Sequence, residues 1–568
     1  MIRPFTGERK APRRIVTFDC EWYPKTYEFR CASTFDGEQY EFYDNPTDLL
    51  QGLCSRSNRG AYVYSHFGGA ADEQFLLQPW LRSEFRIDAV FSGGSMVFVK
   101  VTRDRDCWYL LDSYWTLRRP LGDIARSIGR KKLDDWKCPG ACAHPASDKC
   151  IFYAPDRVVR EYNLEDSVIL WHAMSQFQDE MRELGAELKA TAASNALDLF
   201  RRVYLDGSVK TVGWVNELGR GAYIASRVEV FRPEIQGPAW SYDVNSSFPW
   251  SMTQPTPGNL ERTTKDWSGD DLALVKARVE VPEQYVPPLA YRRLKDGAIY
   301  HPTGSWLGWF TGVDLRALLE TGGRIVKLFK TLLFERRDEL AAYVYELYER
   351  RKKETDPFRR DLYKLLMNGL YGKFGESPEK RTLVIEGGRF TLTRAEKYVP
   401  HRWLPIGATI TARSRQLLGK YLRMAGHVAY ADTDSVFTNN PDMPTGTELG
   451  ELKREKEIRT RAVFFRPKFY QLDGEGVKAK GFTRLSPDQF DGLMRGEPVE
   501  VVRMQRVREK LFQMIRSGAI DADGFVLQEH ALHPCDGSYV KQLNATLRPK
   551  RAPDGESNTR PWTVEELR

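Results

Sequence analysis

Acidic side chains occur in i, i+2 pairs on two segments with the apolar pattern of β-strands, and this feature constrains the chain most. Asp19 and Glu21 end an apolar run near the N-terminus, and Asp432 and Asp434 lie between two apolar runs much later. Alternate residues of a strand point to the same face, so the carboxylates of each pair converge. Converging carboxylates repel each other unless a divalent cation lies between them. The pairs therefore predict two metal sites, although Asp-x-Glu also arises by chance and Asp-Thr-Asp is a common surface turn.

The composition is that of a folded protein with several domains. The chain has 568 residues, 41% hydrophobic and 29% charged, and its 29 Phe, 26 Tyr and 14 Trp can build several cores. At about 100–200 residues per domain, roughly three to five domains are expected. A purely disordered chain is excluded. The net charge of +8 permits a polyanionic partner without requiring one.

The composition favours a cytoplasmic location, which would be the host cytoplasm for a viral protein. There are only 8 Cys, whereas a secreted disulfide scaffold would be much richer in Cys. The basic segment MIRPFTGERKAPRR has no apolar stretch of the kind found in signal peptides. No run of about 18 apolar residues occurs, so no membrane association is expected.

The pattern of the first 185 or so residues predicts an α/β unit. Strands are expected at 15–22, 61–66, 96–101 and 108–115, and helices at 71–81 and 160–184. Later segments predict a strand ending near Pro249, loops with short strands at 254–310, two helices between 333 and 372, and a hairpin at 427–437. The tail from about residue 538 is polar and basic, and is expected to contact nucleic acid or to be partly disordered.

Further acids extend the first pair. Asp72 follows a Gly-Gly turn, and Tyr162 and Asp166 are four residues apart on one predicted helix face. Together with Asp19 and Glu21 they could hold two metal ions, with Tyr162 placing a water molecule. Such sites hydrolyse phosphodiesters by holding both the attacking and the leaving oxygen.

The second pair gains a partner in Asp243, on the strand that ends near Pro249. Between them lies a helix on which Lys364, Asn368 and Tyr371 share one face. A cation, an amide and an aromatic ring suit an incoming nucleotide. Two Mg²⁺ ions would activate a 3′-hydroxyl for attack on its triphosphate and stabilise the pyrophosphate leaving group. An amphipathic helix with a solvated Lys is the alternative.

The order of these motifs resembles family B DNA polymerases, and most closely their protein-primed branch in phages and linear plasmids. Three motifs are similar to those of the exonuclease: Asp19-Cys20-Glu21, Asp72 and Tyr162-x-x-x-Asp166. Four are similar to those of synthesis: Asp243-Val-Asn-Ser-Ser-Phe-Pro249, Lys364-x-x-x-Asn368-Gly-Leu-Tyr371, Tyr430-Ala-Asp432-Thr-Asp434 and Lys478-Ala-Lys480-Gly481. The resemblance covers nearly the whole chain.

The resemblance implies a multidomain fold of α/β and α+β type: an RNase H-like 3′–5′ exonuclease domain followed by a right-hand polymerase with two insertions of the protein-primed type. The expected boundaries are 1–185 for the exonuclease, 186–289 and 403–485 for the palm, 290–336 and 379–402 for the insertions, 337–378 for the fingers, and 486–568 for the thumb and basic tail.

The resemblance also implies residue roles. Metal ligands would be Asp243, Asp432 and Asp434 for synthesis, and Asp19, Glu21, Asp72 and Asp166, with Tyr162, for the exonuclease. The incoming nucleotide would contact Lys364, Asn368, Tyr371, Ser246 and Phe248, and Phe248 would exclude the ribose 2′-hydroxyl. DNA would contact Tyr223, Arg227, Thr433, Lys478 and Lys480.

Some positions depart from the family pattern. Tyr223-Ile-Ala225-Ser226 stands in place of Tyr-x-Gly-Gly, so side chains replace hydrogens where a backbone would approach DNA. In the exonuclease motifs, Phe67 stands where Asn is expected, Ala71 where an aromatic residue is usual, and Trp22 where a small polar residue is usual. Proofreading is expected, but these groups leave its strength open.

Two further groups of residues each allow two interpretations. Cys138, Cys142, His144 and Cys150 could enclose a structural Zn²⁺, or could be free thiols in a loop. The basic residues of 349–360 could be a solvated helix face, or could face the triphosphate or DNA.

The sequence thus predicts a DNA-directed DNA polymerase with a 3′–5′ exonuclease, which uses Mg²⁺, or Mn²⁺ in its place, and dNTPs. The expected partners are primer–template DNA, single-stranded DNA and a terminal protein that primes synthesis on a viral or linear-plasmid genome with displacement of the other strand. The chain would be a monomer or a 1:1 complex with that protein. The alternatives are a primer-independent primase-polymerase of a mobile element, and an inactive DNA-binding scaffold.

Overall fold

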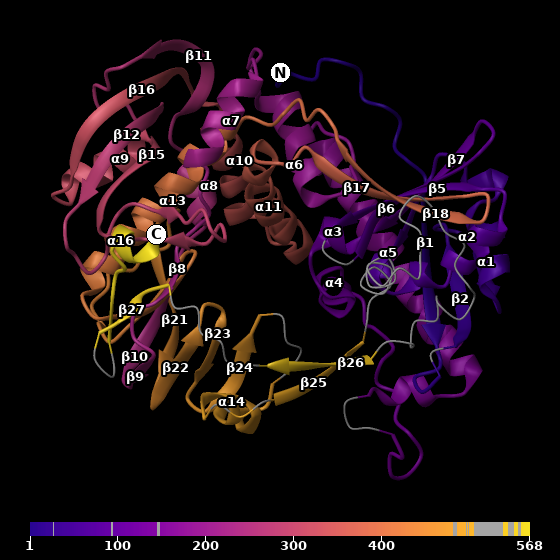
Figure 1. Ribbon diagram of the computed structural model, residues 1–568. Coiled ribbons are helices and arrows are strands. Elements are labelled where there is room, and N and C mark those ends of the chain that lie inside the picture. The colour runs from indigo at the N-terminus through magenta and orange to yellow at the C-terminus, as the bar shows by residue number, and fades with distance from the viewer. Residues whose placement is uncertain are drawn as a thin grey trace.

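Figure 1 shows the chain, in a computed structural model, as two lobes joined by connecting segments. The first 185 residues, drawn indigo to purple, form one lobe, and most later elements form the other. The structure describes all residues except 27, 93–94, 145–147, 481–484, 496, 498, 505–537, 544–549 and 555–557.

The first lobe is built on a mixed sheet with the strand order β18-β17-β5-β6-β7-β4-β1-β2-β3. β1 pairs in parallel with β4 and antiparallel with β2, and α5 packs against β1 and β2. The strands are β1 (Ile15–Trp22), β2 (Phe29–Phe35), β3 (Tyr40–Tyr43), β4 (Tyr62–Ser65), β5 (Arg86–Ser92), β6 (Ser95–Arg103) and β7 (Asp106–Asp112). The helices are α1 (Pro46–Leu53), α2 (Leu77–Arg82), α3 (Tyr114–Leu117), α4 (Leu121–Ser127) and α5 (Asp156–Glu183).

The predicted α/β unit is confirmed, with two local corrections. The helix expected at 71–81 is divided into the 3₁₀ turn η3 (Asp72–Gln74) and α2, because Pro79 lies within the first turn of α2 and is compatible only with a helix start there. The strand expected to reach residue 115 ends at Asp112, where the carboxylate accepts the backbone N–H of Tyr114 (3.0 Å) and α3 begins.

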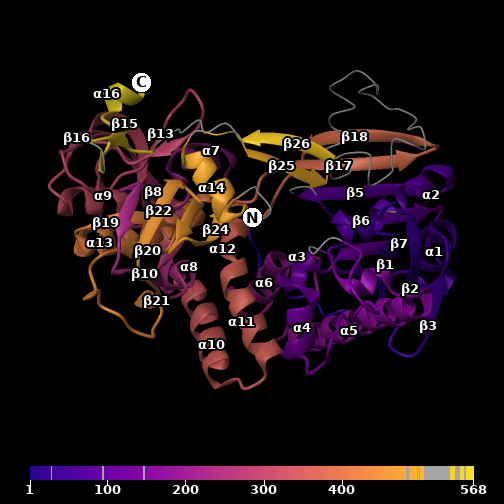
Figure 2. The same ribbon diagram turned by 90° about the horizontal axis from the view of Figure 1, so that it is seen from below.

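Two strands of this sheet come from far along the chain. β17 (Glu379–Glu386) and β18 (Arg389–Glu396) form a hairpin, and β17 pairs antiparallel with β5. Leu383 and Ile385 are buried in the core of the first lobe, and Arg86 donates to Glu386 (2.8 Å). Figure 2 shows β17 and β18 lying along β5. The hairpin falls within the segment 379–402 that was expected to be the second insertion, and it links the two lobes.

The central sheet of the second lobe has the order β21-β10-β20-β19-β8. The predicted hairpin is confirmed, because β19 and β20 pair antiparallel and flank the acidic turn. α13 packs on this sheet and against α7, α8 and α9. The strands are β8 (Val228–Val230), β10 (Ala239–Val244), β19 (Val428–Asp432), β20 (Ser435–Thr438) and β21 (Leu452–Ile458), and α13 is Leu404–Ala425.

Two helices, α10 (Glu339–Lys353) and α11 (Pro357–Gly369), project from the second lobe, as Figure 2 shows. The predicted break is confirmed, because the Asp356 carboxylate accepts the backbone N–H of Phe358 (2.7 Å) and Pro357 occupies the first helical position. The expected start at Leu333 is wrong, because residues up to Arg337 belong to a strand. α11 reaches α5, where Tyr363 donates to Glu180 (2.5 Å).

The expectation of loops with short strands at 254–310 is wrong. This region provides most of a four-stranded sheet in the order β11-β16-β12-β15, covered by α9 (Gly312–Glu320). On β12, Val275, Ala277 and Val279 are buried and alternate with charged residues, as in a strand with one covered face. The sheet begins well before residue 290, with β11 (Thr256–Thr264), β12 (Ala273–Val281), β15 (Gly304–Thr311) and β16 (Arg324–Arg337).

The remaining elements are short and complete the second lobe. The helices are α6 (Ala192–Leu199), the π-helical η5 (Phe200–Tyr204), α7 (Gly213–Ala222), α8 (Ser247–Met252), α12 (Tyr371–Phe374) and α14 (Pro487–Met494). The strands are β9 (Glu234–Gln236), β13 (Tyr291–Arg292), β14 (Ile299–Tyr300), β22 (Arg461–Arg466), β23 (Phe469–Leu472), β24 (Glu475–Ala479), β25 (Val499–Met504) and β26 (Ser538–Leu543).

The last segment of the chain, 550–568, packs on the second lobe. Arg551 is buried within 3.8 Å of Glu229, and Val564 joins the core of the four-stranded sheet. The segment holds β27 (Ala552–Pro553), β28 (Thr559–Arg560) and α16 (Val564–Leu567). The expectation of a partly disordered tail is therefore wrong for the described residues of this segment, because its apolar and charged anchors are buried. Contact of the tail with nucleic acid stays a prediction. Most of 505–549 lies outside the described residues.

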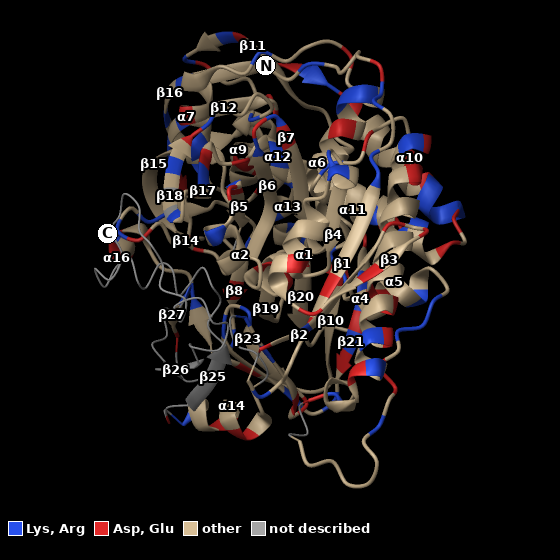
Figure 3. Ribbon diagram, turned by 90° about the vertical axis from the view of Figure 1, so that its right-hand side faces the viewer, with Lys and Arg blue, Asp and Glu red and all other residues tan. Residues whose placement is uncertain are grey.

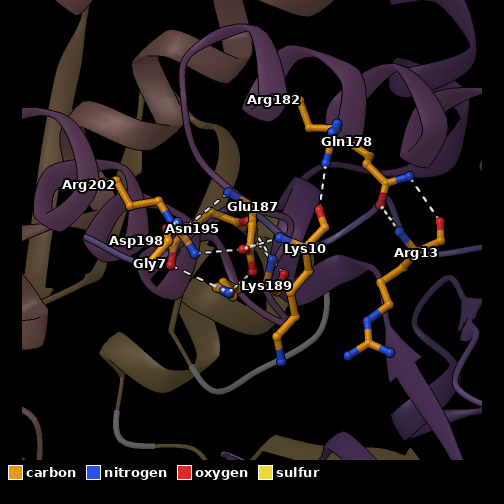
Figure 4. Close-up of polar contacts among 10 residues, drawn as sticks. All are labelled: Gly7, Lys10, Arg13, Gln178, Arg182, Glu187, Lys189, Asn195, Asp198 and Arg202. Atoms are coloured by element: carbon orange, nitrogen blue, oxygen red, sulfur yellow. Dashed lines mark hydrogen bonds and ion pairs between the residues drawn. The ribbon is translucent and has the colours of Figure 1, made fainter. Parts of the chain in front are cut away.

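A polar network ties the N-terminal segment to the junction of the lobes (Figure 4). The backbone N–H of Arg13 donates to the side chain of Gln178 (3.0 Å), which donates back to the Arg13 carbonyl (3.0 Å). Arg202 donates to Glu187 (2.6 Å) and Asp198 (2.9 Å).

Among the described residues, no helix combines the length and the apolar character needed to cross a bilayer.

Two candidate active sites

The first site brings together the five residues expected at the exonuclease centre. β1 supplies Asp19 and Glu21, α5 supplies Tyr162 and Asp166, and Asp72 opens η3. One ligand oxygen each of Asp19, Glu21 and Asp166 lies within 4.8 Å of the other two. Asp72 and Tyr162 line the same cavity, which has a volume of about 600 Å³. This donor set, all oxygen and mostly carboxylate, fits Mg²⁺ or Mn²⁺.

Burial raises the pKa values of these carboxylates. The pKa of Asp19 is raised to about 7, mainly by burial and then by repulsion from Asp166. The pKa values of Glu21 and Asp72 are raised well above their usual range, by burial and then by repulsion from Asp19. Asn163 donates to Asp19 (2.8 Å) and stabilises its charged form.

Lys132 completes this site, and sequence reasoning missed it. Its ammonium donates to the Asp166 carboxylate and lies 4.6 Å from the centre of the Tyr162 ring. It lowers the pKa values of Asp19 and Glu21, against the effect of burial. No local signal could have found it, because Lys132 belongs to an irregular loop between α4 and the 3₁₀ turn η4 (Cys150–Tyr153).

Aromatic side chains occupy the rim of the first cavity at two positions that depart from the family pattern. Phe67 has a left-handed backbone (φ 59°), lines the cavity and stacks on Tyr114 with the ring centres 4.0 Å apart. Trp22 lines the cavity and packs against Phe75 (5.7 Å). His66 accepts or donates a hydrogen bond to Ser113 (2.9 Å), and burial lowers its pKa to about 4, so it orients the turn as a neutral ring.

The second site lies where α10 and α11 face the central sheet of the second lobe. β10 ends at Val244, before the expected Pro249, which lies in α8, and Asp243 is its last residue but one. Asp434 lies beside Asp243, because the backbone N–H of Val244 donates to the Asp434 carbonyl (2.8 Å). Both acids line a cavity of about 600 Å³ together with Lys364 and Asn368. The predicted helix face is thus directed at the predicted acids.

Basic residues of 349–360 line the same cavity, which decides between the two interpretations of that segment. Arg351 and Lys352 come from the end of α10, where basic residues cluster (Figure 3), and Arg360 comes from the first half of α11. The helix side of the cavity therefore carries cations, whereas its sheet side carries carboxylates and Lys453 of β21. An oxygen-rich polyanion such as a triphosphate would be complementary to the helix side.

Asp432 is turned away from this cavity. Its Oδ1 accepts from Lys468 Nζ (2.5 Å), and its Oδ2 accepts from the Tyr430 hydroxyl (3.0 Å). Lys468 was missed, since its proximity to Asp432 depends on the packing of β22 and β23 behind β19. The expected lysines lie further out: Lys478 Nζ is 5.8 Å from the centre of the Tyr470 ring, and the Lys480 backbone donates to the Lys468 carbonyl (2.9 Å).

The two acids that line the second cavity are half-buried. Burial and repulsion from Asp434 raise the pKa of Asp243 to about 7, whereas Lys364 and Lys453 oppose this rise. Burial and repulsion from Asp432 raise the pKa of Asp434 to about 6. Both carboxylates would release protons on binding a divalent cation.

Aromatic rings form one wall of the second site. Phe248 stacks on Tyr371, with ring centres 4.1 Å apart and planes 16° from parallel. Ser246 precedes this wall at a left-handed turn (φ 48°), and Tyr223 lies so close to Gly375 that a side chain at 375 would clash with its ring. The residues expected around an incoming nucleotide are therefore adjacent.

Arg227 was expected to contact DNA, but its side chain lies in the interior of the protein. Its guanidinium is buried, pairs with Glu229 (2.7 Å) and donates to the Pro287 carbonyl (2.9 Å). Its own carbonyl accepts the backbone N–H of Thr433 (2.8 Å), at the turn between Asp432 and Asp434. Arg227 thus supports the acidic turn from inside, because its charge is neutralised within the core.

Comparison with known proteins gives these two sites a common context. The family model described as DNA polymerase type B, organellar and viral, matches residues 157–395. The chain is 22% identical over 475 residues to the DNA-directed DNA polymerase of Enterobacteria phage PRD1, which covers 76% of this chain and 78% of that protein. A structure of phi29 DNA polymerase superposes with a TM-score of 0.69 at 19% identity, over 87% of this chain and 96% of that one.

The chain is thus similar to the organellar and viral type B DNA polymerases over residues 157–395. Its fold is that of phi29 DNA polymerase, in agreement with the predicted fold class. The chain is also 27% identical over 322 residues to a probable DNA polymerase of Ascobolus immersus, and the match covers 26% of that protein. The chain spans from 26% to 48% of the length of the first four fungal relatives it matches.

The matched segment 157–395 contains residues of both sites. Asp166 belongs to the first site, and Asp243 and Lys364 belong to the second. The acidic hairpin with Asp434 lies beyond it, and only the fold brings that hairpin to Asp243.

Proposed function

We propose that the chain is a template-directed DNA polymerase with a separate 3′–5′ exonuclease site. One observation carries this proposal: two carboxylate sites lie in different lobes, and only the second faces a row of cations on α10 and α11. A single hydrolytic enzyme would need only one such site. When bound, Mg²⁺ ions at each site would activate the attacking oxygen and neutralise charge on the leaving group.

At the second site, the side chains of the chain itself bind and orient the nucleotide. Lys364, Arg360 and Arg351 hold the triphosphate, since they line the cavity across from Asp243 and Asp434. The stacked pair Phe248 and Tyr371 lies under the sugar and leaves no room for a ribose 2′-hydroxyl. Asp432, held by Lys468, positions the turn that carries Asp434.

At the first site, Asp19, Glu21, Asp72 and Asp166 surround the scissile phosphate of a frayed 3′ end. Tyr162 orients the attacking water, and Lys132 holds Asp166 and neutralises part of the charge. Phe67 and Tyr114 offer a stacked aromatic surface on which an unpaired base can lie. Proofreading follows because the same 3′ end can move between the two sites.

Initiation from a terminal protein and displacement of the non-template strand extend the proposal. The resemblance to the protein-primed branch supports the first. The hairpin β17–β18, which joins the lobes through β5, supports the second, because such a link can enclose a template strand. The proposed partners are primer–template DNA, single-stranded DNA and a terminal protein, and the proposed location is the host cytoplasm.

The test is extension of a primed circular single-stranded template with Mg²⁺ and four dNTPs, beside the same circle without primer. We expect products longer than the circle from the primed template only. Products from both templates would instead favour a primer-independent primase-polymerase. DNA binding without any product would contradict the polymerase and favour an inactive scaffold.

A further inference from the structure

A long irregular loop forms one side of the exonuclease cavity. It runs from the end of α4 at Ser127 to the start of η4 at Cys150, and its described residues form no helix or strand. Irregular loops of this length are uncommon in compact domains unless they bind something or are held by something. This loop carries Cys138, Cys142 and His144, and it ends at Cys150.

The structure brings these four side chains to one point. One ligand atom of each lies within 4.8 Å of all the others, and the Sγ atoms of Cys142 and Cys150 are 3.6 Å apart. A tetrahedron with Zn–S bonds of about 2.3 Å separates its sulfurs by about 3.8 Å. A disulfide would need about 2.05 Å, so Cys142 and Cys150 are not bonded to each other, and the three cysteines of the cluster are thiols that can act as ligands.

The donor set also selects the metal. Three thiolates and one imidazole are soft to intermediate donors, which favour Zn²⁺ over the hard cations that suit the carboxylate sites. Four protein ligands close the coordination sphere and leave no position for substrate. We propose that Cys138, Cys142, His144 and Cys150 bind one structural Zn²⁺ ion.

The proposed zinc site lies directly beside the exonuclease cavity. Lys132, Asp134 and Lys149 all line that cavity, and Lys149 pairs with Asp134 (2.7 Å) across the base of the loop. Arg130 pairs with Glu165 of α5 (2.9 Å), and Lys132 pairs with Asp166 of the same helix. The ion therefore fixes both ends of the loop against α5, and with them the position of Lys132.

Metal content tests the site without any assumption about activity. The full chain, purified without a histidine tag or chelators, should contain about one zinc per chain by mass spectrometry of the metals. Cys142→Ser should reduce this to near zero, and Cys142→His, which keeps a ligand, should retain it. Cys107→Ser is the matched control, since Cys107 lies outside the cluster and its thiol donates a hydrogen bond to the Tyr109 hydroxyl (3.4 Å).

A second measurement identifies the ligands. After exchange into Co²⁺, the chain should show the strong thiolate-to-cobalt absorption of a tetrahedral site, and Cys138→Ser should weaken it. The proposal is overturned if the wild-type chain neither contains nor takes up zinc or cobalt. It is also overturned if a Cys142–Cys150 disulfide forms, or if Cys142→Ser retains full zinc.

The role of the ion rests on the proposed exonuclease function and is tested separately. Cys142→Ser should lower degradation of a single-stranded 3′ end by roughly tenfold, because Lys132 loses its anchor. Primer extension should stay within about twofold, which also shows that the variant is folded. Loss of zinc with unchanged degradation would overturn the role in the cavity wall. If the wild-type chain has no nuclease activity, the proposed function fails, whereas zinc content still decides the metal site.

Discussion

The two carboxylate sites differ in where their balancing positive charge lies. At the proposed exonuclease site Glu21, Asp72 and Asp166 are buried and Asp19 is partly buried, and Lys132 touches Asp166 from within the lobe. At the synthesis site Asp243 and Asp434 are half-buried, and the nearest cations line the opposite side of a cavity. The first site thus carries its own counter-charge, whereas the second keeps its cations available for the phosphates of a substrate.

This difference agrees with what each site would bind. A frayed 3′ end brings one scissile phosphodiester, which a site lined by Lys132 and Lys149 can accommodate. A triphosphate brings about four negative charges, and these need Lys364, Arg351 and Arg360 to be unpaired before binding. Lys364 and Arg360 line the cavity, and neither forms an ion pair with any of the described acidic side chains. Asp432, by contrast, already has Lys468, so it serves to shape the turn.

The largest effects should come from removing a carboxylate at one site only. Asp434→Ala should lower DNA synthesis by at least ~100-fold, because charge developing at the reaction centre loses its stabilisation, and should leave 3′ degradation intact. The double variant Asp19→Ala, Glu21→Ala should do the reverse. Primer extension and degradation of a labelled single strand measure the two. Loss of both activities in either variant would contradict two separate sites.

Lys364→Ala tests whether the cations across the second cavity bind substrate. A charge-assisted hydrogen bond is worth about 1.5–3 kcal/mol, so kcat/KM for dNTP should fall by roughly 10- to 150-fold. Steady-state single-nucleotide incorporation measures this, and exonuclease activity should not change. Lys353→Ala is the matched control, because Lys353 is exposed on α10 and does not line the cavity. Equal effects of both changes would mean a general loss of DNA binding.

Lys132→Met tests the internal counter-charge of the exonuclease site. The substitution keeps the length of the side chain but removes the charge that opposes the raised pKa of Asp19. We expect 3′ degradation to fall by roughly tenfold, with synthesis unchanged. Lys131→Met is the control, since the neighbouring Lys131 pairs with Asp135 at the surface (2.6 Å). An unaltered degradation rate would show that Lys132 does not act at this site.

The sequence predicted those elements whose pattern is local. β1, the acidic hairpin and the break before α11 follow from alternation, turn residues and an Asp-Pro cap, all visible within about ten residues. The strands of 254–310 were missed because Pro, Gly and Trp dominate that segment. Moreover, β12 pairs with β16, about fifty residues later, and no local pattern reports such a pairing.

The candidate sites show the same limit. Ordered motifs indicated the carboxylates and Lys364, but Lys132 and Lys468 reach their acids only through tertiary packing. Arg227 shows the opposite failure, because a position beside a motif does not reveal whether a side chain is buried. The spacing of Cys138, Cys142, His144 and Cys150 indicated a possible cluster, and the structure brings the four together.

The two activities should also differ in how their Mg²⁺ requirement depends on pH, and this few-fold effect is smaller than those above. Asp243 and Asp434, with pKa values raised to about 7 and about 6, bind more protons in the folded than in the unfolded state. They therefore lower the stability of the metal-free chain as pH rises toward 7, and Mg²⁺ must displace their protons below that pH. The Mg²⁺ concentration for half-maximal synthesis should fall between pH 6 and 7 and then level off.

The exonuclease should behave differently, because burial raises the pKa values of Glu21 and Asp72 well above their usual range. Its Mg²⁺ requirement should continue to fall above pH 7, where that of synthesis is constant. Titrations of both activities with Mg²⁺ at four pH values on one preparation measure this, and Mg²⁺ should raise the Tm more at pH 8 than at pH 6. Parallel curves for the two activities would mean that the difference in burial does not control metal binding, and that the internal lysine compensates for it.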